Sequence, residues 1–470
     1  MNKLSYIFII FILSPYYIYS QNDTIQYEAG FIGVASHGVY SPFWLQSKQY
    51  GKISTASYSA DIMVGINKEL KNETKLFDYG FKANLLVQTD ATKSNIYFHE
   101  MYIKARLSVF DMIIGSREEH LGNQDSTLSS GGMLFSQNSR PMPKITFGIE
   151  HFTPVPFTLG YIELKGALVH GWFSDNTYIK NARLLHNYVY VKVGGRLPVH
   201  FEYGLDHVAQ WGGYNPEFGQ QPTSFGDYIK ILKGQSGGSN ASIGDQINAL
   251  GNHIISQSMK LEVNILDYRI SGYWQNISED GPIRIIWDTM NRPDGLWGIS
   301  LRNNKFPFVK GILYEYLNTT DQSGPYHDKD GIIYGGADSY YTNSSFPSGW
   351  SYYSRTIGTP FISSPAYNTD GSLSTLNNRV QVHHIGIEGD VYGYQYRLLS
   401  SYSKNYGSYN SPLGDEKKKN VSVMMEIRKL LPKHSNIEIG GSLAADYGKL
   451  YGNSAGCMLS IRKTGDLFHY

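Results

Sequence analysis

Aromatic side chains gather in one long polar stretch of the chain, residues 319–379. Planar rings can stack on the faces of sugars, and the Asn and Asp side chains between them can bond sugar hydroxyls. We therefore predict that carbohydrate binds to rings of this stretch and to two tryptophans near strand ends. The candidates are Tyr340, Tyr341, Trp350, Tyr352 and Tyr353, together with Trp211 and Trp287. The alternative is that these rings pack the loop or form an aromatic belt at a membrane boundary.

The patterns that could carry catalysis are weak. Two G-x-S-x-G matches occur, at residues 234–238 and 452–456. The first lies in a Gly/Ser-rich loop and the second opens a strand, whereas a nucleophilic serine requires a strand–turn–helix context. His99-Glu100 begins like a zinc-protease motif, but Ile103 stands where the second histidine must be. We predict no catalytic residue and no enzymatic activity.

The sequence also gives little support for a metal, a cofactor or a nucleic acid. His383 and His384 are adjacent, so on a strand they point to opposite faces and cannot easily share a metal. The sequence contains no Cys/His cluster and no phosphate-binding loop, so we expect no cofactor. Lys and Arg number 41 against 40 Asp and Glu, which gives no strong field for nucleic acid. A single cysteine, Cys457, excludes an intrachain disulfide framework.

Residues 1–20 have the features of a secretory signal peptide. Lys3 supplies the positive charge, residues 7–13 supply the apolar core, and Ser20 is a small residue before the expected cut. About seven strongly apolar residues are too few to span a bilayer as an anchor. We expect export and a mature domain that comprises residues 21–470.

An alternation of apolar and polar residues between 256 and 302 indicates the structure of that mature domain. Leu261 and Val263 alternate with polar neighbours, and after a tight turn at 266–267 the same period of two resumes. Such a strand buries one face on a core, or turns it to lipid while the other face lines a wet lumen. In the second case the lumen-facing polar residues here are Lys260, Glu262, Arg269 and Gln275.

The connections between strands favour a membrane barrel. No stretch beyond the signal approaches the roughly 20 apolar residues of a membrane helix, so a membrane-spanning structure must be a closed barrel. Turns after even strands are mostly brief, whereas loops after odd strands are usually long, which is typical of short periplasmic turns and long extracellular loops. We predict an all-β, antiparallel up-and-down transmembrane barrel of about 18 strands. The predicted strands are 27–39, 55–67, 77–88, 96–107, 110–116, 145–150, 159–173, 184–193, 199–211, 256–265, 268–276, 296–302, 308–318, 380–390, 392–406, 420–428, 437–445 and 455–462.

Four details refine this prediction. Residues 242–250 have a helical pattern with Ser242 as N-cap, so a short helix could fold inward and obstruct the lumen. The apolar phase changes across residues 383–384, which indicates a bulge or a misplaced strand. Cys457 lies in the apolar phase of the last strand and is expected to face lipid. The terminal aromatic Tyr470 follows the last predicted strand by several residues, so that strand runs further or the tail is extra.

Several separated segments resemble members of the Wzi capsule-assembly family from Bacteroidetes. They are Pro42-Phe43-Trp44-Leu45-Gln46, Gln49-Tyr50-Gly51, Arg140-Pro141-Met142-Pro143-Lys144, Ala249-Leu250-Gly251-Asn252-His253, Pro293-Asp294-Gly295-Leu296-Trp297-Gly298 and Asn377-Asn378-Arg379-Val380. The resemblance implies an outer-membrane barrel of about 18 strands. It also implies a lectin that holds capsular polysaccharide or exopolysaccharide at the cell surface without a catalytic step.

The expected partners are therefore surface polysaccharide and outer-membrane lipid, and we expect a monomer. The alternative function is an outer-membrane channel for small solutes, because polar lumen-facing residues suit an open pore as well as a plugged one. The family supplies no catalytic motif and no sugar-binding motif that transfers by position, so the sugar-contact residues named above rest on loop position and ring chemistry alone.

Overall fold

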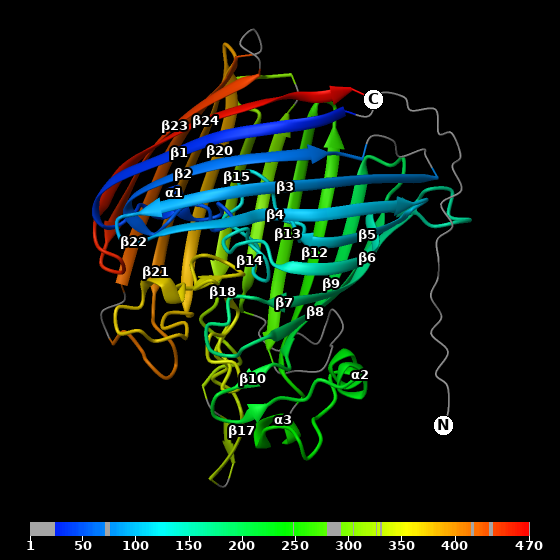
Figure 1. Ribbon diagram of the computed structural model, residues 1–470, viewed down its shortest axis with the longest axis vertical. Coiled ribbons are helices and arrows are strands. Elements are labelled where there is room, and N and C mark those ends of the chain that lie inside the picture. The colour runs from blue at the N-terminus through cyan, green and yellow to red at the C-terminus, as the bar shows by residue number, and fades with distance from the viewer. Residues whose placement is uncertain are drawn as a thin grey trace.

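Eighteen antiparallel strands form one sheet that closes on itself in the computed structural model of this chain (Figure 1). Strand β1 (Thr24–Tyr40) pairs with β24 (Ser454–His469), from Thr24 opposite His469 to His37 opposite Ala455. Because the first and last strands pair, the sheet has no open edge. The structure describes residues 24–70, 76–247, 249–279, 293–303, 305–325, 327–329, 331–414, 418–431 and 436–469.

Every barrel strand pairs with its neighbours in sequence order, which makes an up-and-down barrel. The other barrel strands are β2 (Ala56–Lys68), β3 (Phe77–Asp90), β4 (Ser94–Leu107), β5 (Phe110–Ser116), β6 (Pro143–Pro154), β7 (Ile162–Phe173), β8 (Ala182–Val193), β9 (Val199–Trp211), β12 (Asn252–Ile265), β13 (Tyr268–Glu279), β14 (Gly295–Asn303), β15 (Gly311–Asn318), β20 (Val380–Val391), β21 (Tyr394–Asn405), β22 (Lys418–Leu431) and β23 (Ile437–Gly448). All the predicted strands are confirmed, most of them with boundaries shifted by a few residues.

The loops carry small elements. These are the pairs β10 (Tyr214–Asn215) with β11 (Gly219–Gln220), β16 (His327–Lys329) with β17 (Ile332–Gly335) and β18 (Ser351–Tyr352) with β19 (Arg355–Thr356), the helices α1 (Phe43–Gln46), α2 (Phe225–Lys233) and α3 (Ile243–Ile247), and the 3-10 helix η1 (Pro365–Tyr367). None of the helices in the described residues is long and apolar enough to cross a membrane.

The two faces of the barrel wall differ in chemistry. On β12 and β13, Leu261 and Ile270 are exposed on the outer face, while Ser258, Ser271 and Gln275 are buried on the inner face. The same outward apolar pattern recurs around the barrel, for example at Ile62, Ile103, Leu168, Ile299, Ile385, Met425 and Leu459. Cys457 is exposed in the same phase as Leu459, as predicted. An apolar belt around a closed barrel is the surface that contacts lipid.

The phase change at His383-His384 is not a bulge. The register of β20 runs without a shift along both β15 and β21. Val382 and His384 are buried on the inner face, whereas Ile385 is exposed on the outer face. The two valines at the start of β20 therefore face an apolar region inside the barrel, where a wet lumen would have required polar residues.

The strand connections are sorted between the two barrel ends. Tight turns at 108–109, 266–267 and 392–393 lie at one end, together with the start of β1 and the finish of β24. Long loops at 117–142, 212–251 and 319–379 lie at the other end, although β3 and β4 are joined there by only residues 91–93. Strand β24 continues to His469, so the last strand runs further than predicted and the tail is not extra.

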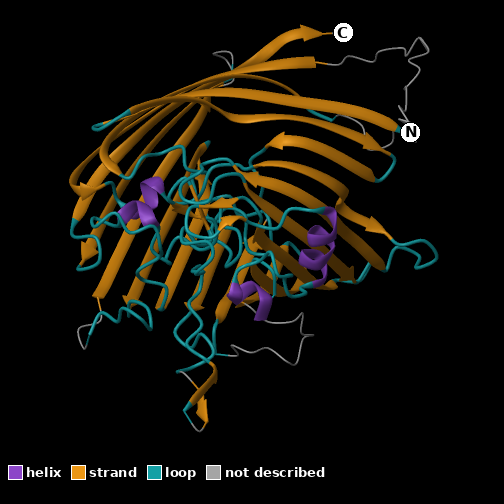
Figure 2. Ribbon diagram, turned by 60° about the horizontal axis from the view of Figure 1, so that its bottom comes forward, coloured by secondary structure: helices purple, strands orange, loops and turns teal. Residues whose placement is uncertain are grey.

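The barrel interior is filled by three segments, residues 41–55, 117–142 and 337–379, which we call the lumen segments (Figure 2). One buried apolar cluster joins them to the wall: Phe43, Trp44, Leu45, Ile53, Leu128, Met133, Leu134, Met142, Tyr340, Tyr341, Phe346, Trp350, Tyr352, Ile357, Phe361 and Ile362 pack with inward residues of β1, β8, β9, β12–β15 and β20–β24. The predicted helix at 242–250 exists as α3, but the helix in the lumen is α1. Residue Leu250, which follows α3, instead packs with Ile231 of α2 and Trp211.

Candidate functional site

Residues 117–142, which we call the plug segment, are fastened to the wall through Glu315 of β15. The Glu315 carboxylate accepts hydrogen bonds from Ser129 Oγ and from the Ser130 backbone N–H, each at 2.6 Å. Tyr273 of β13 donates its hydroxyl to the same carboxylate. Irregular backbone can be buried in a barrel only where wall side chains satisfy its polar groups, and Glu315 does so here.

A second attachment joins the plug segment to β14. Arg302 places its guanidinium on the Asp125 carboxylate, with Nε–Oδ2 at 2.8 Å and Nη2–Oδ1 at 2.7 Å, and reaches Glu388 Oε1 at 2.6 Å. Burial alone would raise the pKa of Asp125, but the Arg302 guanidinium and the backbone N–H groups of Leu128 and Thr127 hold that pKa below its usual range. Because this fork is bidentate, it fixes the direction of the plug segment as well as its position.

The aromatic residues of segment 337–379 pack against the plug segment. Trp350 Nε1 donates to the Leu134 carbonyl at 2.8 Å, and the Tyr341 hydroxyl donates to the Met133 carbonyl. The Tyr352 hydroxyl lies 2.6 Å from Ser174 Oγ. These rings and their polar tips are therefore used inside the protein.

One ring of this segment remains accessible at the mouth of the barrel. Tyr353 is 41% exposed. The Arg140 guanidinium lies 4.4 Å from the Tyr353 ring centroid and 3.8 Å from the Tyr97 ring centroid. Arg140 Nη2 also reaches Gln88 Oε1 at 3.3 Å. We call these four residues the mouth stack; cation–π contacts on two tyrosine rings fix the arginine without neutralising its charge.

Several polar atoms beside the mouth stack have no hydrogen-bond partner among the described residues. They are Ser59 Oγ, both carboxylate oxygens of Asp61 and the Tyr97 hydroxyl, all on inward-facing positions of β2 and β4. Buried polar groups of this kind are commonly paired with ordered water. The groups that can reach a sugar carrying hydroxyl or acidic groups are therefore the exposed ring and the fixed guanidinium.

The start of the plug segment is held by ion pairs at the inner face of β4. Glu118 Oε1 lies 2.8 Å from Lys52 Nζ and 2.7 Å from His99 Nε2. Burial alone would raise the pKa of Glu118, but Lys52 and His99 lower it to about 2. Glu119 pairs with Lys144 and Arg117, and these cations likewise lower its pKa to about 2 against the effect of burial.

Comparison with known proteins identifies the family of this chain. The family model described as "Capsule assembly protein Wzi" matches residues 41–379, which include all three lumen segments. The chain belongs to the Wzi capsule-assembly family. Its closed barrel and apolar belt place it in the bacterial outer membrane as a multi-pass protein. No curated protein matches the chain in sequence.

Two solved structures with TM-scores above 0.5 resemble the fold of this chain. The Wzi protein of Escherichia coli, described as an outer-membrane carbohydrate-binding β-barrel involved in group 1 capsule assembly, aligns with a TM-score of 0.57 and 12% identity over 92% of this chain and 83% of that chain. OccK5 (OpdH) of Pseudomonas aeruginosa aligns with a TM-score of 0.51 and 6% identity over 95% of this chain and 99% of that chain. At such identities the likeness shows the fold alone.

Within this Wzi-family barrel, most of the rings predicted to bind sugar have other neighbours. Tyr340, Tyr341, Trp350 and Tyr352 are buried in the lumen cluster, and Trp211 is buried beneath α2 on the outer wall. Their ring faces contact protein and are not open to a sugar. Trp287 lies outside the described residues. Tyr353 alone keeps an exposed ring and stays a prediction.

The predicted lumen-facing residues all occupy the inner phase of the wall. The Gln275 side-chain oxygen accepts a hydrogen bond from the Met133 backbone N–H at 3.1 Å, and its NH₂ group donates to Asn123 and Gln124. Gln275 therefore holds the plug segment. Lys260 pairs with Glu262 at 3.5 Å. Arg269 is exposed beside the tight turn at 266–267.

Sequence reasoning missed Arg140, Tyr97 and Gln88 of the mouth stack. Arg140 falls in one of the segments that resemble the family, but its contact with Tyr353 joins residues more than two hundred positions apart. No local pattern reveals such a contact. His99 and His384 have structural partners, Glu118 and Leu128 O respectively, and the described residues contain no group of three or more ligands for a metal.

Proposed function

We propose that this protein binds capsular polysaccharide or exopolysaccharide at the outer face of the outer membrane and retains it there, as a non-enzymatic monomer. The supporting observation is the mouth stack, an exposed Tyr353 on a fixed Arg140, at the opening of a barrel whose lumen is filled. Membership of the capsule-assembly family supports the same role. Residues 1–20 would direct export, and residues 21–470 would form the mature barrel.

The mechanism is attachment through many weak contacts. Stacking on one exposed ring contributes about 1 kcal/mol, which is far too little to hold a sugar alone. A polymer presents the same unit repeatedly, so each release is followed by rebinding at high effective concentration. The Arg140 guanidinium suits a polymer that carries carboxylate or other acidic groups, because it retains its charge between the two rings.

Binding of the purified protein to the polysaccharide of its own cell surface tests this proposal. We expect Tyr353→Ala and Arg140→Ala each to weaken binding about fivefold, and the double variant to weaken it further. The matched control is Tyr392→Ala, because Tyr392 is exposed in a tight turn at the opposite end of the barrel. Binding that is unchanged in the double variant, or weakened equally by the control, would remove the mouth stack from the proposal.

A further inference from the structure

Helix α2 lies against the outside of the barrel. A buried apolar cluster joins Ile231 and Leu250 of the loop to Leu185, Ala209 and Trp211 of strands β8 and β9. Leu185 is in phase with the exposed Val189, and Trp211 is in phase with the exposed Phe201, so these side chains leave the outer face of the wall. The adjacent residue Gln210 points the other way, into the lumen, where its side chain donates a hydrogen bond to the Gly349 carbonyl at 3.0 Å.

The helix is well formed and has a fixed place. Ser224 and Asp227 form a capping box at its N-terminus, with Asp227 Oδ2 accepting from Ser224 N–H at 2.9 Å. Gly234 ends the helix with φ 61°, a left-handed conformation that favours glycine. Tyr228 packs on Trp211 with ring centroids 5.7 Å apart. The loop from 212 to 251 therefore holds α2 against the outer ends of β8 and β9.

The apolar face of α2 extends beyond its contact with the wall. Ile231 faces the barrel and is buried, while Phe225, Ile229 and Leu232, at i, i+4 and i+7, continue the apolar face around the side of the helix. Phe225 is 79% exposed and Leu232 is 36% exposed. The exposed Phe225 side chain leaves a large apolar surface uncovered beside the lipid-facing wall, which suits a helix with apolar surroundings on that side.

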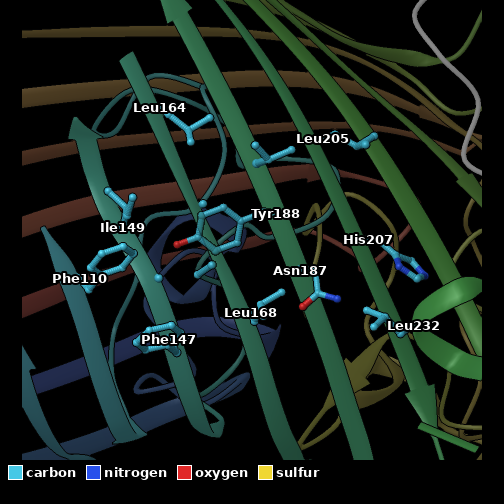
Figure 3. A pocket seen from close by; sticks show the side chains of 14 residues that line it. Phe110, Phe147, Ile149, Leu164, Leu168, Asn187, Tyr188, Leu205, His207 and Leu232 are labelled. Carbon is cyan, nitrogen blue, oxygen red and sulfur yellow. The ribbon is translucent and has the colours of Figure 1, made fainter. Parts of the chain in front are cut away.

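An apolar groove connects α2 to the lipid-facing belt (Figure 3). The groove has a volume of about 550 Å³ and runs over the outer face of β5 to β9. Leu232 and His207 lie at its α2 end, and Phe110 and Phe147 stack at the other end with ring centroids 5.9 Å apart. Between them the lining side chains include Ile149, Leu164, Leu168, Val189 and Leu205. Apart from Asn187, Tyr188 and His207 the lining side chains are apolar, so a hydrocarbon chain fits most of the groove.

Two lysines border the apolar face of α2. Lys230 and Lys233 lie in its last turn, and no ion pair joins either of them within the part of the chain that the structure describes. Lysine side chains near an anionic lipid surface are attracted to it. An apolar face flanked by lysines is the pattern of a helix that lies in a membrane interface.

We propose that α2 and this groove bind a phosphorylated lipid of the outer leaflet, with an acyl chain in the groove and the phosphate at Lys230 and Lys233. The long-loop end of the barrel carries α2, so the lipid belongs to the leaflet that faces outside. This site is separate from the mouth stack. The bound lipid would hold the barrel at a fixed depth in the membrane, and this role does not depend on polysaccharide binding.

Spin labels on single cysteines test the position of α2. In a Cys457→Ser background, cysteines replace Phe225 or Leu232, and Gln235 of the exposed loop after α2 serves as the matched control. In vesicles of phosphatidylglycerol, we expect labels at 225 and 232 to be relaxed mainly by oxygen and the label at 235 by a water-soluble nickel complex. Nickel access at 225 and 232 equal to that at 235 would overturn the proposal.

Lipid binding to the purified barrel tests the role of the lysines. Native mass spectrometry with phosphatidylglycerol, lipopolysaccharide or the zwitterionic, net-neutral phosphatidylcholine distinguishes the headgroups. We expect the double variant Lys230→Gln/Lys233→Gln to lose at least fivefold in affinity for the two anionic lipids while phosphatidylcholine binding is unchanged. The control is Lys93→Gln, an exposed lysine of the β3–β4 turn. Equal affinities for the double variant and the unaltered protein would refute the assignment of the phosphate.

Discussion

At the scale of single residues, charge pairs decide where the lumen is filled. Two ion pairs join the plug segment to other parts of the barrel, Glu118 with Lys52 and Asp125 with Arg302. Glu315 adds a hydrogen bond from the plug backbone. A buried ion pair adds little net stability, because the loss of water around both charges offsets their attraction. Breaking such a pair is costly, since the remaining charge is left buried without a partner. These pairs therefore specify the position of the plug segment.

The ion pairs of Glu118 and Glu119 predict an acid-sensitive plug segment. Both carboxyls have a pKa of about 2 in the folded protein, below their usual value of 4.5. A lowered pKa stabilises the folded state above pH 4.5, and this stabilisation disappears as the pH falls toward 2. We expect pepsin to cleave within residues 117–142 much faster at pH 2.5 than at pH 4.5.

The matched variant for that experiment is Glu118→Gln/Glu119→Gln. Its side-chain amides do not take up a proton in this range, so we expect its plug segment to be cleaved at similar rates at both pH values, after correction for the activity of pepsin. A pH dependence as steep as that of the unaltered protein would show that other groups cause the acid response.

At the scale of the elements, the wall and the lumen segments depend on each other. The wall supplies inward apolar residues such as Val382 of β20, which a wet lumen would not tolerate, and Leu128 of the plug segment lies in the same buried cluster. His384 Nε2 lies 2.7 Å from the Leu128 carbonyl and so satisfies one of the backbone groups of the plug. The plug segment is therefore part of the fold.

A disulfide between plug and wall tests this conclusion. A Cβ built at Gly386 of β20 lies 2.9 Å from both the Leu128 Cβ and the Leu128 carbonyl oxygen, closer than the roughly 3.5–4.5 Å Cβ separation of disulfides, so the backbone must shift for the bond to form. We expect Leu128→Cys/Gly386→Cys, in the Cys457→Ser background, to form that disulfide and still retain polysaccharide. The control pairs Leu128→Cys with Gly441→Cys, because Gly441 has no atom within 4 Å of an added Cβ. A disulfide in the control but not in the test pair would place the plug segment elsewhere.

Local periodicity was sufficient to predict the wall but not its contents. The alternation at Leu261 and Ile270 marks the lipid face directly, because lipid imposes a period of two on each strand. The lumen segments have irregular backbone and no period, so their sequence resembles that of surface loops. Tyr341 and Trp350 have the composition of a sugar-binding loop, but their burial depends on contacts with Met133 and Leu134, about two hundred residues away.

At the scale of the whole molecule, the protein is a membrane barrel with a closed interior and two outward surfaces. Buried apolar side chains of β1, β8, β9, β12–β15 and β20–β24 join those of the lumen segments in one cluster inside the barrel. Polar chambers remain toward the short-turn end, one of about 330 Å³ at Glu150 and Lys165 and one of about 370 Å³ at Glu28 and Arg462. The mouth stack faces outside, and the apolar belt with α2 faces lipid.

The filled lumen predicts the absence of solute conduction. In a planar bilayer we expect the unaltered protein to give no large open-channel current. Replacement of residues 118–141 by a short Gly-Ser linker removes the attachments at Glu315 and Arg302 and should produce current steps. A large stable current from the unaltered barrel would favour the solute channel instead.

Polysaccharide retention by living cells tests the central claim most directly. The measurement compares cell-attached with shed polysaccharide, at equal total synthesis, in cells that lack the gene and in the same cells complemented with the unaltered protein or with Arg140→Ala/Tyr353→Ala. We predict that loss of the gene moves polymer into the medium, that the unaltered protein restores attachment, and that the double variant restores it only in part. Attachment that is unchanged when the gene is absent would contradict a role in retaining polysaccharide.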